Sequence, residues 1–338
     1  MIMNTYKQKE STDEEGLIIT GIRPSGNLTI ANFVGSVIPF LELQKKKNPT
    51  FVFVATMHGL TDKEPSEVMS NVNAIVKDYL ALGLDPDSVT IFDQKALRYE
   101  VALLKLYLER HITISRLIRV PTLKDKLKRG QNPEQASALL AGYPIMMAAD
   151  ILLQRAKLVP VGKDQFSHVE VARELAKDFN SKYGDVFVVP ECLNRAEPVN
   201  ILALRGEGKM SKSYPEDAIF LTDSEATIEK KIKRAETANP GERSEKIDSL
   251  AFLTKIISAE ASREIEEILK RHEKGEKVMV DFKRSVSKAV ISFVNQFQER
   301  RKKIDDKKVK EVLSSGEEKA SSQARDTINK VESLLGVN

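Results

Sequence analysis

The sequence predicts an α/β protein: a Rossmann-like, doubly wound parallel sheet followed by an appended α-helical domain. The first part of the chain alternates short β-branched apolar runs with amphipathic helical periods. From about residue 224 the strand signals fade, and Lys- and Glu-rich helical periods replace them. Alternating strands and helices indicate a parallel sheet covered by helices. We therefore expect a flexible extension over 1–15, a sheet domain over 16–223 with a helical insertion at about 97–155, and a helical domain over 224–338.

The composition limits the classes of protein and of partner that the sequence permits. The chain has 338 residues, and its 53 Lys and Arg are nearly balanced by 49 Asp and Glu, so the net charge of +4 permits a nucleic-acid partner without requiring one. Cys192 is the only cysteine, which excludes an internal disulfide and a thiolate metal cluster. No apolar run approaches the roughly 18 residues of a membrane span. Residues 1–15 are polar and contain acids, unlike a secretory signal. We expect a cytoplasmic protein with no membrane contact.

The elements of the first domain follow from periodicity. Leu17–Thr20 indicates a buried strand, and 21–27 (GIRPSGN) is turn chemistry. An amphipathic helix follows, whose apolar positions are Ile30, Phe33, Val34, Val37, Ile38 and Leu41. Phe51–Val54 is the second strand. A second helix is marked by Val68, Val72, Val76, Tyr79 and Leu80.

Val89–Phe92 is the third strand, and 97–140 is helical with a basic interruption at 124–129. A helix at about 143–155, a strand at Leu158–Val161, a helix at 167–183 and a strand at Val199–Leu204 complete the domain. Ligands of such sheets bind beyond the carboxyl ends of the strands, which predicts a site at the loops 21–29 and 55–62.

Two loops carry the chemistry for binding a polyanion. The first joins strand to helix, and a helix N-terminus offers unpaired N–H groups to phosphate. Thr29 and Asn32 share one face there, although Thr29 is equally well explained as a helix cap. The second loop, Lys209–Ser213 (KMSKS), follows Gly206 and Gly208. Its two ammonium groups are suited to closing over a triphosphate and stabilising charge on a leaving pyrophosphate.

KMSKS is a signature that makes the chain resemble the class I aminoacyl-tRNA synthetases, with Thr29-Ile30-Ala31-Asn32 in the place of their first motif. Within that class it resembles the bacterial tryptophanyl-tRNA synthetases over nearly its whole length. The segments 143–153 and 159–165 resemble their tryptophan pocket, and 227–235 resembles the segment after their mobile loop. The chain departs from the pattern at Ala31, where glycine is usual, and at Thr56-Met57 before His58, where Asp-Gln is usual.

The resemblance implies a set of site residues. The groups expected to act on the phosphates are Lys209, Lys212, Thr29, Asn32 and Lys124. The ATP site is expected to comprise Arg23, Ser25, Gly26, Thr29, Ala31, Asn32, Gly162, Asp164, Lys209, Met210, Ser211, Lys212 and Ser213. The tryptophan site is expected to comprise Asp150, Gln165, Met147, Tyr143, His58, Val159, Val161 and Ile19.

Asp150 stands amid apolar residues, where a carboxylate needs a partner, and it suits the single N–H donor of an indole. His58 is as easily a structural histidine as a functional one. His111, His168 and His272 are interpreted as structural, and the four histidines have no metal-binding spacing.

The implied reaction is the ATP-dependent ligation of L-tryptophan to tRNA(Trp) through a tryptophanyl-adenylate, with Mg²⁺ accompanying ATP. The helical domain would read the anticodon, and Arg300–Lys303 would follow a phosphate backbone or form a solvated helix face. The resemblance also implies a homodimer.

Two alternatives stay open. A tyrosyl-tRNA synthetase shares the fold. A phenol hydroxyl both donates and accepts hydrogen bonds, however, and the expected pocket offers it only the acceptor Asp150 amid apolar side chains. A non-catalytic RNA-binding paralogue is favoured only by Ala31.

Overall fold

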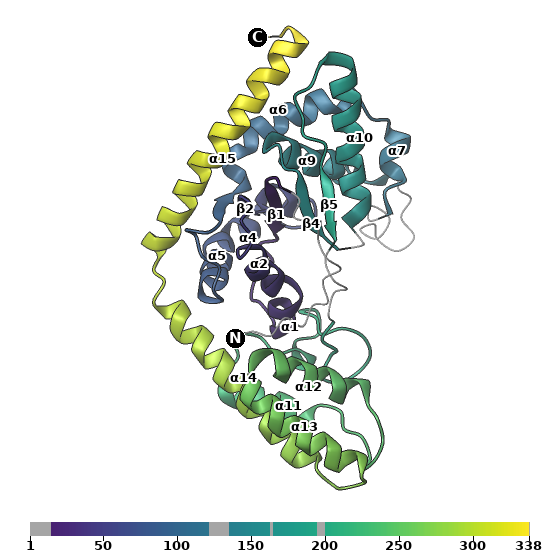
Figure 1. Ribbon diagram of the computed structural model, residues 1–338, viewed down its shortest axis with the longest axis vertical. Coiled ribbons are helices and arrows are strands. Elements are labelled where there is room, and N and C mark those ends of the chain that lie inside the picture. Colours follow the sequence, from purple (N-terminus) through teal and green to yellow (C-terminus); the bar gives the residue numbers. More distant parts are fainter. Residues whose placement is uncertain (1–14, 122–134, 163–164, 195–199, 338) are drawn as a thin grey trace.

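A computed structural model describes residues 15–121, 135–162, 165–194 and 200–337 (Figure 1). Within these residues five parallel strands form one sheet in the order β3-β2-β1-β4-β5. The strands are β1 (Ile18–Ile22), β2 (Thr50–Val54), β3 (Thr90–Asp93), β4 (Leu158–Val161) and β5 (Glu191–Asn194). The chain reverses its direction of winding between β1 and β4, so a crevice is expected beyond the carboxyl ends of these two strands. The predicted doubly wound parallel sheet is confirmed.

The strands pair in the register that their buried side chains favour. Ile18 of β1 aligns with Thr50 of β2 and with Leu158 of β4. All five residues of β2 are buried, as expected for a central strand of a sheet covered on both faces. The prediction missed β5 and was wrong at 199–204, where the described residues form only an isolated bridge between Leu202 and Lys209.

Helices cover the sheet between its strands. They are α1 (Ile30–Asn32), α2 (Ile38–Leu43), α3 (Thr56–Gly59), α4 (Pro65–Ser70), α5 (Val72–Ala81), α6 (Arg98–Glu109), α7 (Ile114–Ile118), α9 (Ala138–Leu153) and α10 (Phe166–Tyr183). The first predicted helix is continuous but contains a π-helical stretch, Phe33–Val37, before Pro39. Proline has no N–H to donate to the preceding turn, which explains the change of hydrogen-bond pattern there.

Helix α9 begins earlier than the sequence indicated. Ser137 caps it by accepting a hydrogen bond from the Leu140 amide at 3.1 Å. The helix then continues through Gly142 and Pro144, two residues that usually end helices. Both are buried, so packing outweighs the local preference at this point.

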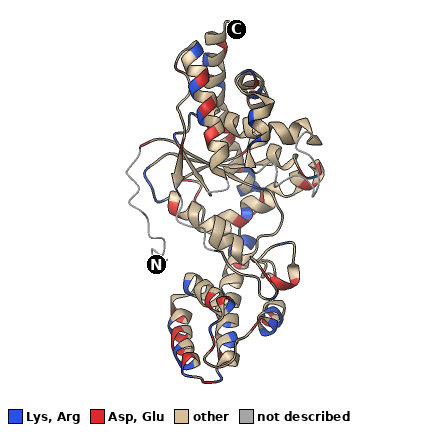
Figure 2. Ribbon diagram, turned by 90° about the vertical axis from the view of Figure 1, so that its right-hand side faces the viewer, with Lys and Arg blue, Asp and Glu red and all other residues tan. Residues whose placement is uncertain are grey.

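The second part is helical, as predicted. It contains α11 (Glu225–Arg234), α12 (Glu245–Ile257), α13 (Ala259–Glu273) and α14 (Met279–Lys302). The stripe of α14 at Phe282, Val286, Val290, Val294 and Phe297 is fully buried. Residues of both charges occur along these helices (Figure 2).

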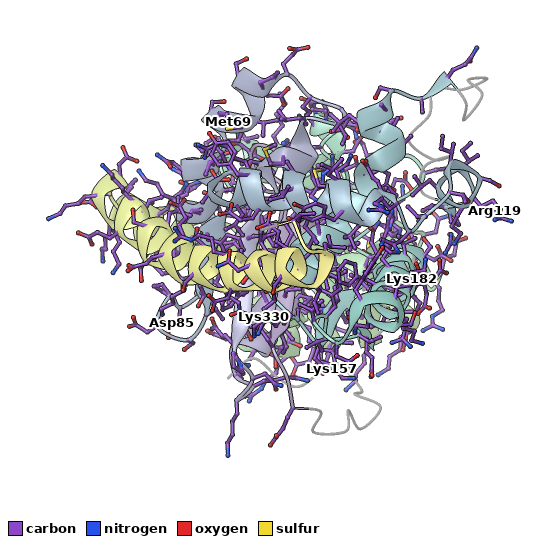
Figure 3. The ribbon with its side chains drawn as sticks, turned by 90° about the horizontal axis from the view of Figure 1, so that it is seen from above. Met69, Asp85, Arg119, Lys157, Lys182 and Lys330 are labelled. Atoms are coloured by element: carbon purple, nitrogen blue, oxygen red, sulfur yellow. The ribbon has the colours of Figure 1, made fainter. Side chains whose placement is uncertain are left out.

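The last helix departs from the predicted division into domains. Helix α15 (Asp306–Leu335) leaves the other helices of the second part and runs along the sheet domain (Figures 1 and 3). Its Ala320, Ala324, Ile328 and Val331 join the core that surrounds α9 and α10. At Gly316 the helix backbone lies directly against edge strand β3, where an added Cβ would stand 1.9 Å from the carbonyl oxygen of Ile91. By packing, α15 therefore belongs to the sheet domain.

Candidate active site

A cavity of about 640 Å³ opens where β1 and β4 end. At one end it is lined by the loop after β1, including Arg23, Ser25 and Asn32. At the other end it is lined by residues of α9 and of the segment after β4, including Tyr143, Met147 and Gln165. The location matches the expected crevice of a doubly wound sheet.

Thr29 acts as the cap of the first helix. Its side-chain oxygen accepts from the Asn32 amide at 3.2 Å, and the Asn32 side-chain oxygen accepts from the Thr29 amide at 3.0 Å. The Ile30 amide donates to the carbonyl of Ile219 at 2.9 Å. The chain itself therefore uses the amides of Thr29, Ile30 and Asn32, and Thr29 is a helix cap, one of the two readings that the sequence left open. Of the capping pair, only Asn32 lines the cavity.

Backbone pairing ties the two predicted loops together. Thr29 and Phe220 form an antiparallel bridge, and the Leu221 amide donates to the carbonyl of Leu28 at 2.9 Å. Phe220 lies shortly after the KMSKS segment. The first loop and the second loop are thus fixed to one another by main-chain hydrogen bonds, independently of their side chains.

Lys212 reaches across to the first loop. Its Nζ donates to the carbonyls of Ser25 at 2.9 Å and Gly26 at 3.1 Å, and lies 3.1 Å from Ser25 Oγ. Burial lowers the pKa of Lys212 to about 8, an effect that Asp78 opposes and Lys63 reinforces. Gly26 has a φ of +74°, a backbone conformation that favours glycine. The ammonium group is thus half-buried at the edge of the cavity.

Lys209 occupies a different position. Its backbone is held in the bridge to Leu202, and its side chain is exposed. Met210 is buried in the core. The two lysines of KMSKS are therefore not equivalent in this conformation of the loop.

A buried carboxylate lies behind the other end of the cavity. The Asp150 side chain is 4% exposed, and its Oδ2 lies 2.8 Å from His58 Nε2. Since a carboxylate only accepts hydrogen bonds, the His58 Nε2 carries the proton. Gln94 Nε2 lies 2.9 Å from Oδ1 and 2.8 Å from Oδ2, and Gln94 Oε1 accepts from the amides of Met57 and His58. The network fixes both the carboxylate and the loop 55–62.

Thr56 takes part in fixing that loop. Its hydroxyl donates to Asp93 Oδ1 at 2.6 Å and accepts from the Lys95 amide at 3.1 Å. Thr56 is fully buried. The departure from the family pattern at this position therefore has a structural use, as a tie between β2 and the end of β3.

Tyr143 and His168 form a second buried pair. Tyr143 Oη lies 2.5 Å from His168 Nε2, and their rings are 5.0 Å apart. Tyr143 lines the cavity together with the apolar walls Ile19, Val159 and Val161. His168, interpreted from sequence as structural, thus contacts a residue of the cavity wall.

Half of the 22 expected site residues line one cavity. Its lining includes Arg23, Ser25, Asn32, Gly162, His58, Tyr143, Met147, Gln165, Val159, Val161 and Ile19. Asp150 is not among the lining residues, but it contacts His58, which is one of them. Ser211 accepts from the Ser213 amide at 3.2 Å, and both lie on the KMSKS loop outside the lining. Lys124 and Asp164 lie outside the described residues.

Sequence reasoning missed Gln94. It follows β3 directly, so the rule that functional groups gather beyond strand ends was a signal that could have found it. Ser36, Phe40 and Tyr79 also line the cavity and were not expected there. Tyr79 was assigned to the apolar face of a helix, and periodicity does not separate a residue of the core from one that lines a cavity.

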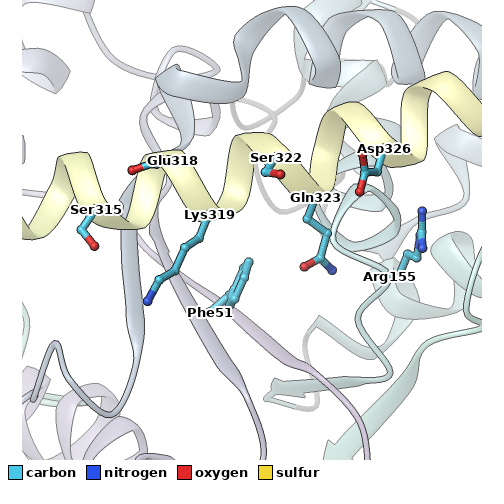
Figure 4. Close-up of a pocket in the computed structure, with 8 residues that line it drawn as sticks. All are labelled: Phe51, Arg155, Ser315, Glu318, Lys319, Ser322, Gln323 and Asp326. Atoms are coloured by element: carbon cyan, nitrogen blue, oxygen red, sulfur yellow. The ribbon is translucent and has the colours of Figure 1, made fainter.

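A second hollow, of about 830 Å³, lies beneath α15 between Phe51 and Arg155 (Figure 4). The α15 residues on its rim are exposed and of mixed charge, including Glu318, Lys319 and Asp326. None of the site residues expected from the sequence lines it.

The doubly wound sheet, the capped first motif and the lysine loop paired to it define a class I aminoacyl-tRNA synthetase. The family described as tRNA synthetases class I (W and Y) matches residues 12–295, and the chain belongs to it. Within that class, several of its relatives are tryptophan–tRNA ligases. The one from Chlamydia caviae is 34% identical over 335 residues, covering 94% of this chain and 95% of that protein. The one from Porphyromonas gingivalis is 35% identical over 330 residues, covering 94% and 98%.

A solved structure agrees with this placement. The crystal structure of tryptophanyl-tRNA synthetase from Campylobacter jejuni complexed with ADP and tryptophan has a TM-score of 0.82 and 31% identity. The match covers 95% of this chain and 99% of that one.

Proposed function

We propose that the protein activates L-tryptophan with ATP to tryptophanyl-adenylate and transfers the acyl group to tRNA(Trp). One cavity carries this proposal. Its first end is bordered by the loop after β1, which Lys212 of the lysine loop contacts. Its other end is bordered by His58, which contacts Asp150. We infer that a nucleotide and an amino acid lie end to end in this cavity. Named relatives of this chain are tryptophan–tRNA ligases.

At the amino-acid end, the groups suit an indole. Ile19, Met147, Val159 and Val161 provide apolar walls. The indole N–H needs one acceptor, and the carboxylate of Asp150 with its neighbour His58 is the polar centre of that end. Gln94 holds Asp150 from behind, so the carboxylate keeps its orientation. We assign Gln165 and Tyr143 to the α-ammonium end of the substrate.

At the nucleotide end, the chemistry is positioning and charge stabilisation. The tryptophan carboxylate attacks the α-phosphate of ATP, and pyrophosphate leaves without a protein nucleophile. Lys212 stabilises the charge that moves to the pyrophosphate, and Asn32, Ser25 and Arg23 border the same end of the cavity. Arg23 is held at 2.7 Å from Asp62, so its guanidinium is already oriented.

We propose that Mg²⁺ arrives with ATP. The described residues contain no group of three or more His, Cys, Asp or Glu side chains that could hold a metal ion. The ligands in the proposal are therefore phosphate oxygens and water.

The tRNA and the second subunit are also part of the proposal. Arg300–Lys303 was expected either to follow a phosphate backbone or to form a solvated helix face, and Arg301 donates a hydrogen bond to Asp78 while Lys302 donates one to Glu299. Contacts of the anticodon stem are therefore proposed elsewhere on α11–α14, whose faces carry both charges (Figure 2).

For the homodimer, the support is exposed apolar side chains on helices that pack together. These are Tyr99 and Leu106 on α6, Ile114 on α7 and Leu139 on α9. None of the described helices is long and apolar enough to span a membrane. We place the reaction in the cytoplasm because protein synthesis uses tRNA and ATP there.

The test is ATP–pyrophosphate exchange and tRNA charging with purified protein. Exchange that depends on tryptophan, and charging of bulk tRNA with labelled tryptophan, are the expected results. Exchange with tyrosine in place of tryptophan would assign the protein to the tyrosine branch of the family. Absence of exchange with either amino acid, in folded protein, would favour the non-catalytic paralogue.

A further inference from the structure

Helices α9 and α10 pack together at the amino-acid end of the cavity, and a buried hydrogen bond joins them there. Tyr143 of α9 lines the cavity, whereas His168 of α10 is not among the lining residues. The two residues are 4% and 0% exposed, and Tyr143 Oη lies 2.5 Å from His168 Nε2. The hydroxyl of a cavity residue is therefore held by a fully buried residue that does not itself line the cavity.

Helix α10 also supplies Gln165 to this end of the cavity. Gln165 is the N-cap residue of the helix and lines the cavity. His168 lies three residues further along, so the two side chains lie on the same face of the first helical turn. One turn of α10 thus brings one polar side chain to the cavity directly and holds a second, the hydroxyl of Tyr143, through His168.

The direction of this hydrogen bond decides what Tyr143 offers to a ligand. Burial favours the neutral imidazole, in which one ring nitrogen carries a proton and the other accepts. With Nε2 as the acceptor, the Tyr143 hydroxyl donates its only proton to His168 and keeps its lone pairs for the cavity. With the proton on Nε2, the hydroxyl hydrogen would be left for the cavity instead. An ammonium group only donates, so the first arrangement is the one that suits it.

We propose that His168 is a positioning residue: its Nε2 accepts the hydrogen bond of the Tyr143 hydroxyl and thereby makes Tyr143 an acceptor for the α-ammonium group of the amino acid. The proposal deepens the function proposed above and rests on it, because it takes the ammonium end of the cavity from that assignment. His168 touches no substrate and acts only through Tyr143. It selects for the charged α-amino group, independently of the indole end at Asp150.

Three indole ligands separate the ammonium group from the rest of the substrate. Indole-3-propionate lacks the α-ammonium group of tryptophan, and tryptamine keeps an ammonium group but lacks the carboxylate. The chain contains no tryptophan, so indole fluorescence excited beyond the absorption of tyrosine comes from the ligand alone. The dissociation constants of all three ligands can therefore be measured on the same protein.

Two replacements of nearly equal length test the acceptor at His168. His168→Gln keeps a hydrogen-bonding group near the position of Nε2, whereas His168→Met places a methyl group there. His168→Met is expected to weaken the binding of tryptophan and of tryptamine by about five- to twenty-fold, as for one hydrogen bond to a charged group. Indole-3-propionate should lose less than about two-fold. His168→Gln is expected to recover most of the lost affinity.

The same hydrogen bond can be removed from its other side. Tyr143→Phe should show the same pattern among the three ligands, with a loss at least as large for tryptophan. The double variant Tyr143→Phe/His168→Met should lose no more than Tyr143→Phe, because His168 acts only through the hydroxyl. In pyrophosphate exchange, His168→Met should raise the KM for tryptophan and leave kcat nearly unchanged, since the ammonium group keeps its charge throughout the reaction.

His272 offers a matched control. It is a buried histidine of α13 whose Nε2 lies 2.8 Å from the carbonyl oxygen of Glu242, and it is not among the residues that line the cavity. His272→Met makes the same chemical change as His168→Met. It should leave all three dissociation constants unchanged, although it should lower the thermal stability.

Equal losses for tryptophan and indole-3-propionate in His168→Met would overturn the proposal, because His168 would then only support the pocket. Equal weakening of tryptophan in His168→Gln and His168→Met would also overturn it. So would an unchanged ratio of the two affinities in Tyr143→Phe, a result that does not depend on the folding of His168→Met. Wild-type protein without tryptophan-dependent exchange would instead overturn the proposed function, while the three dissociation constants would still decide the role of His168.

Discussion

The Nε2 atom of His58 lies 2.8 Å from Oδ2 of Asp150, and this contact joins the loop after β2 to helix α9. The two side chains are 16% and 4% exposed, so the carboxylate is removed from water while the imidazole still borders the cavity. Gln94 holds both partners, through the carboxylate on one side and the His58 amide on the other. We therefore expect the choice of amino acid to depend on the Asp150 carboxylate together with His58 and Gln94, which hold it in place.

Asp150→Asn should weaken the choice of tryptophan. The change keeps the size but removes the charge, and a charge-assisted hydrogen bond is worth roughly 1.5–3 kcal/mol. The specificity constant for tryptophan in pyrophosphate exchange should fall by about ten- to one hundred-fold. Phenylalanine and tyrosine, which lack an indole N–H, should lose much less. Asp178→Asn, in the other His–Asp pair with His111, is the control and should leave discrimination intact. A folded Asp150→Asn protein with full preference for tryptophan would refute the assignment.

Lys212→Ala should reduce adenylate formation by at least about one hundred-fold, because an ammonium group aimed at developing charge acts mainly in the transition state. Tryptophan binding, measured by equilibrium titration, should change little. Lys209→Ala should act in the same direction but more weakly, since its side chain is exposed in this conformation. Lys230→Ala, an exposed cation on α11, is the control. A comparable loss of tryptophan affinity in Lys212→Ala would contradict the assignment of Lys212 to the phosphates of ATP.

Ala31→Gly should leave the rate of pyrophosphate exchange unchanged or raise it, with any gain appearing as a lower KM for ATP. Ala31 is partly buried in α1 against the core, and we expect the loop to leave room for its methyl group. The glycine costs helix stability of up to about 1 kcal/mol, visible in thermal unfolding. Ala102→Gly, at an exposed position of α6, should show a similar loss of stability without any effect on ATP. Weaker ATP binding in Ala31→Gly would mean that the methyl group is used.

Gly316→Ala should destabilise the protein, although alanine usually favours a helix by about 1 kcal/mol over glycine. The new Cβ would lie 1.9 Å from the Ile91 carbonyl oxygen and 2.6 Å from its carbon, so helix or strand must move. A loss of about 1–3 kcal/mol in denaturant unfolding is expected. Ser315→Ala, exposed on the same turn of α15, should instead be neutral or slightly stabilising. Equal stability of Gly316→Ala and wild type would show that α15 does not press on β3.

The order of strands and helices could be predicted because hydrophobic period and β-branched runs are local properties. The four strands from β1 to β4 were found in this way, and so was the buried stripe of α14. Strand β5 (ECLN) has no apolar alternation, and only its pairing with β4 makes it a strand. The early start of α9 was missed because Gly142 and Pro144 are breakers unless tertiary packing overrides them.

In the site, too, local features could be predicted from the sequence, whereas long-range contacts could not. Motif residues such as Lys212 and His58 could be named because their types and spacing are distinctive in sequence. Their partners could not, since Gln94 lies 56 residues from Asp150 and Arg301 lies 223 residues from Asp78. Sequence left the role of Thr29 open between a helix cap and a phosphate contact, because the capping bond from the Thr29 amide to the Asn32 side chain depends on a rotamer that sequence does not specify.

The packing of α15 on β3 has a consequence for how the chain is made. β3 is an edge strand, and an uncovered strand edge can pair with other chains. Helix α15 (306–335), which packs on this edge around Gly316, emerges from the ribosome long after the sheet has been synthesised. During translation the edge of β3 therefore stays exposed until α15 packs on it. In this interval the nascent protein is prone to aggregation.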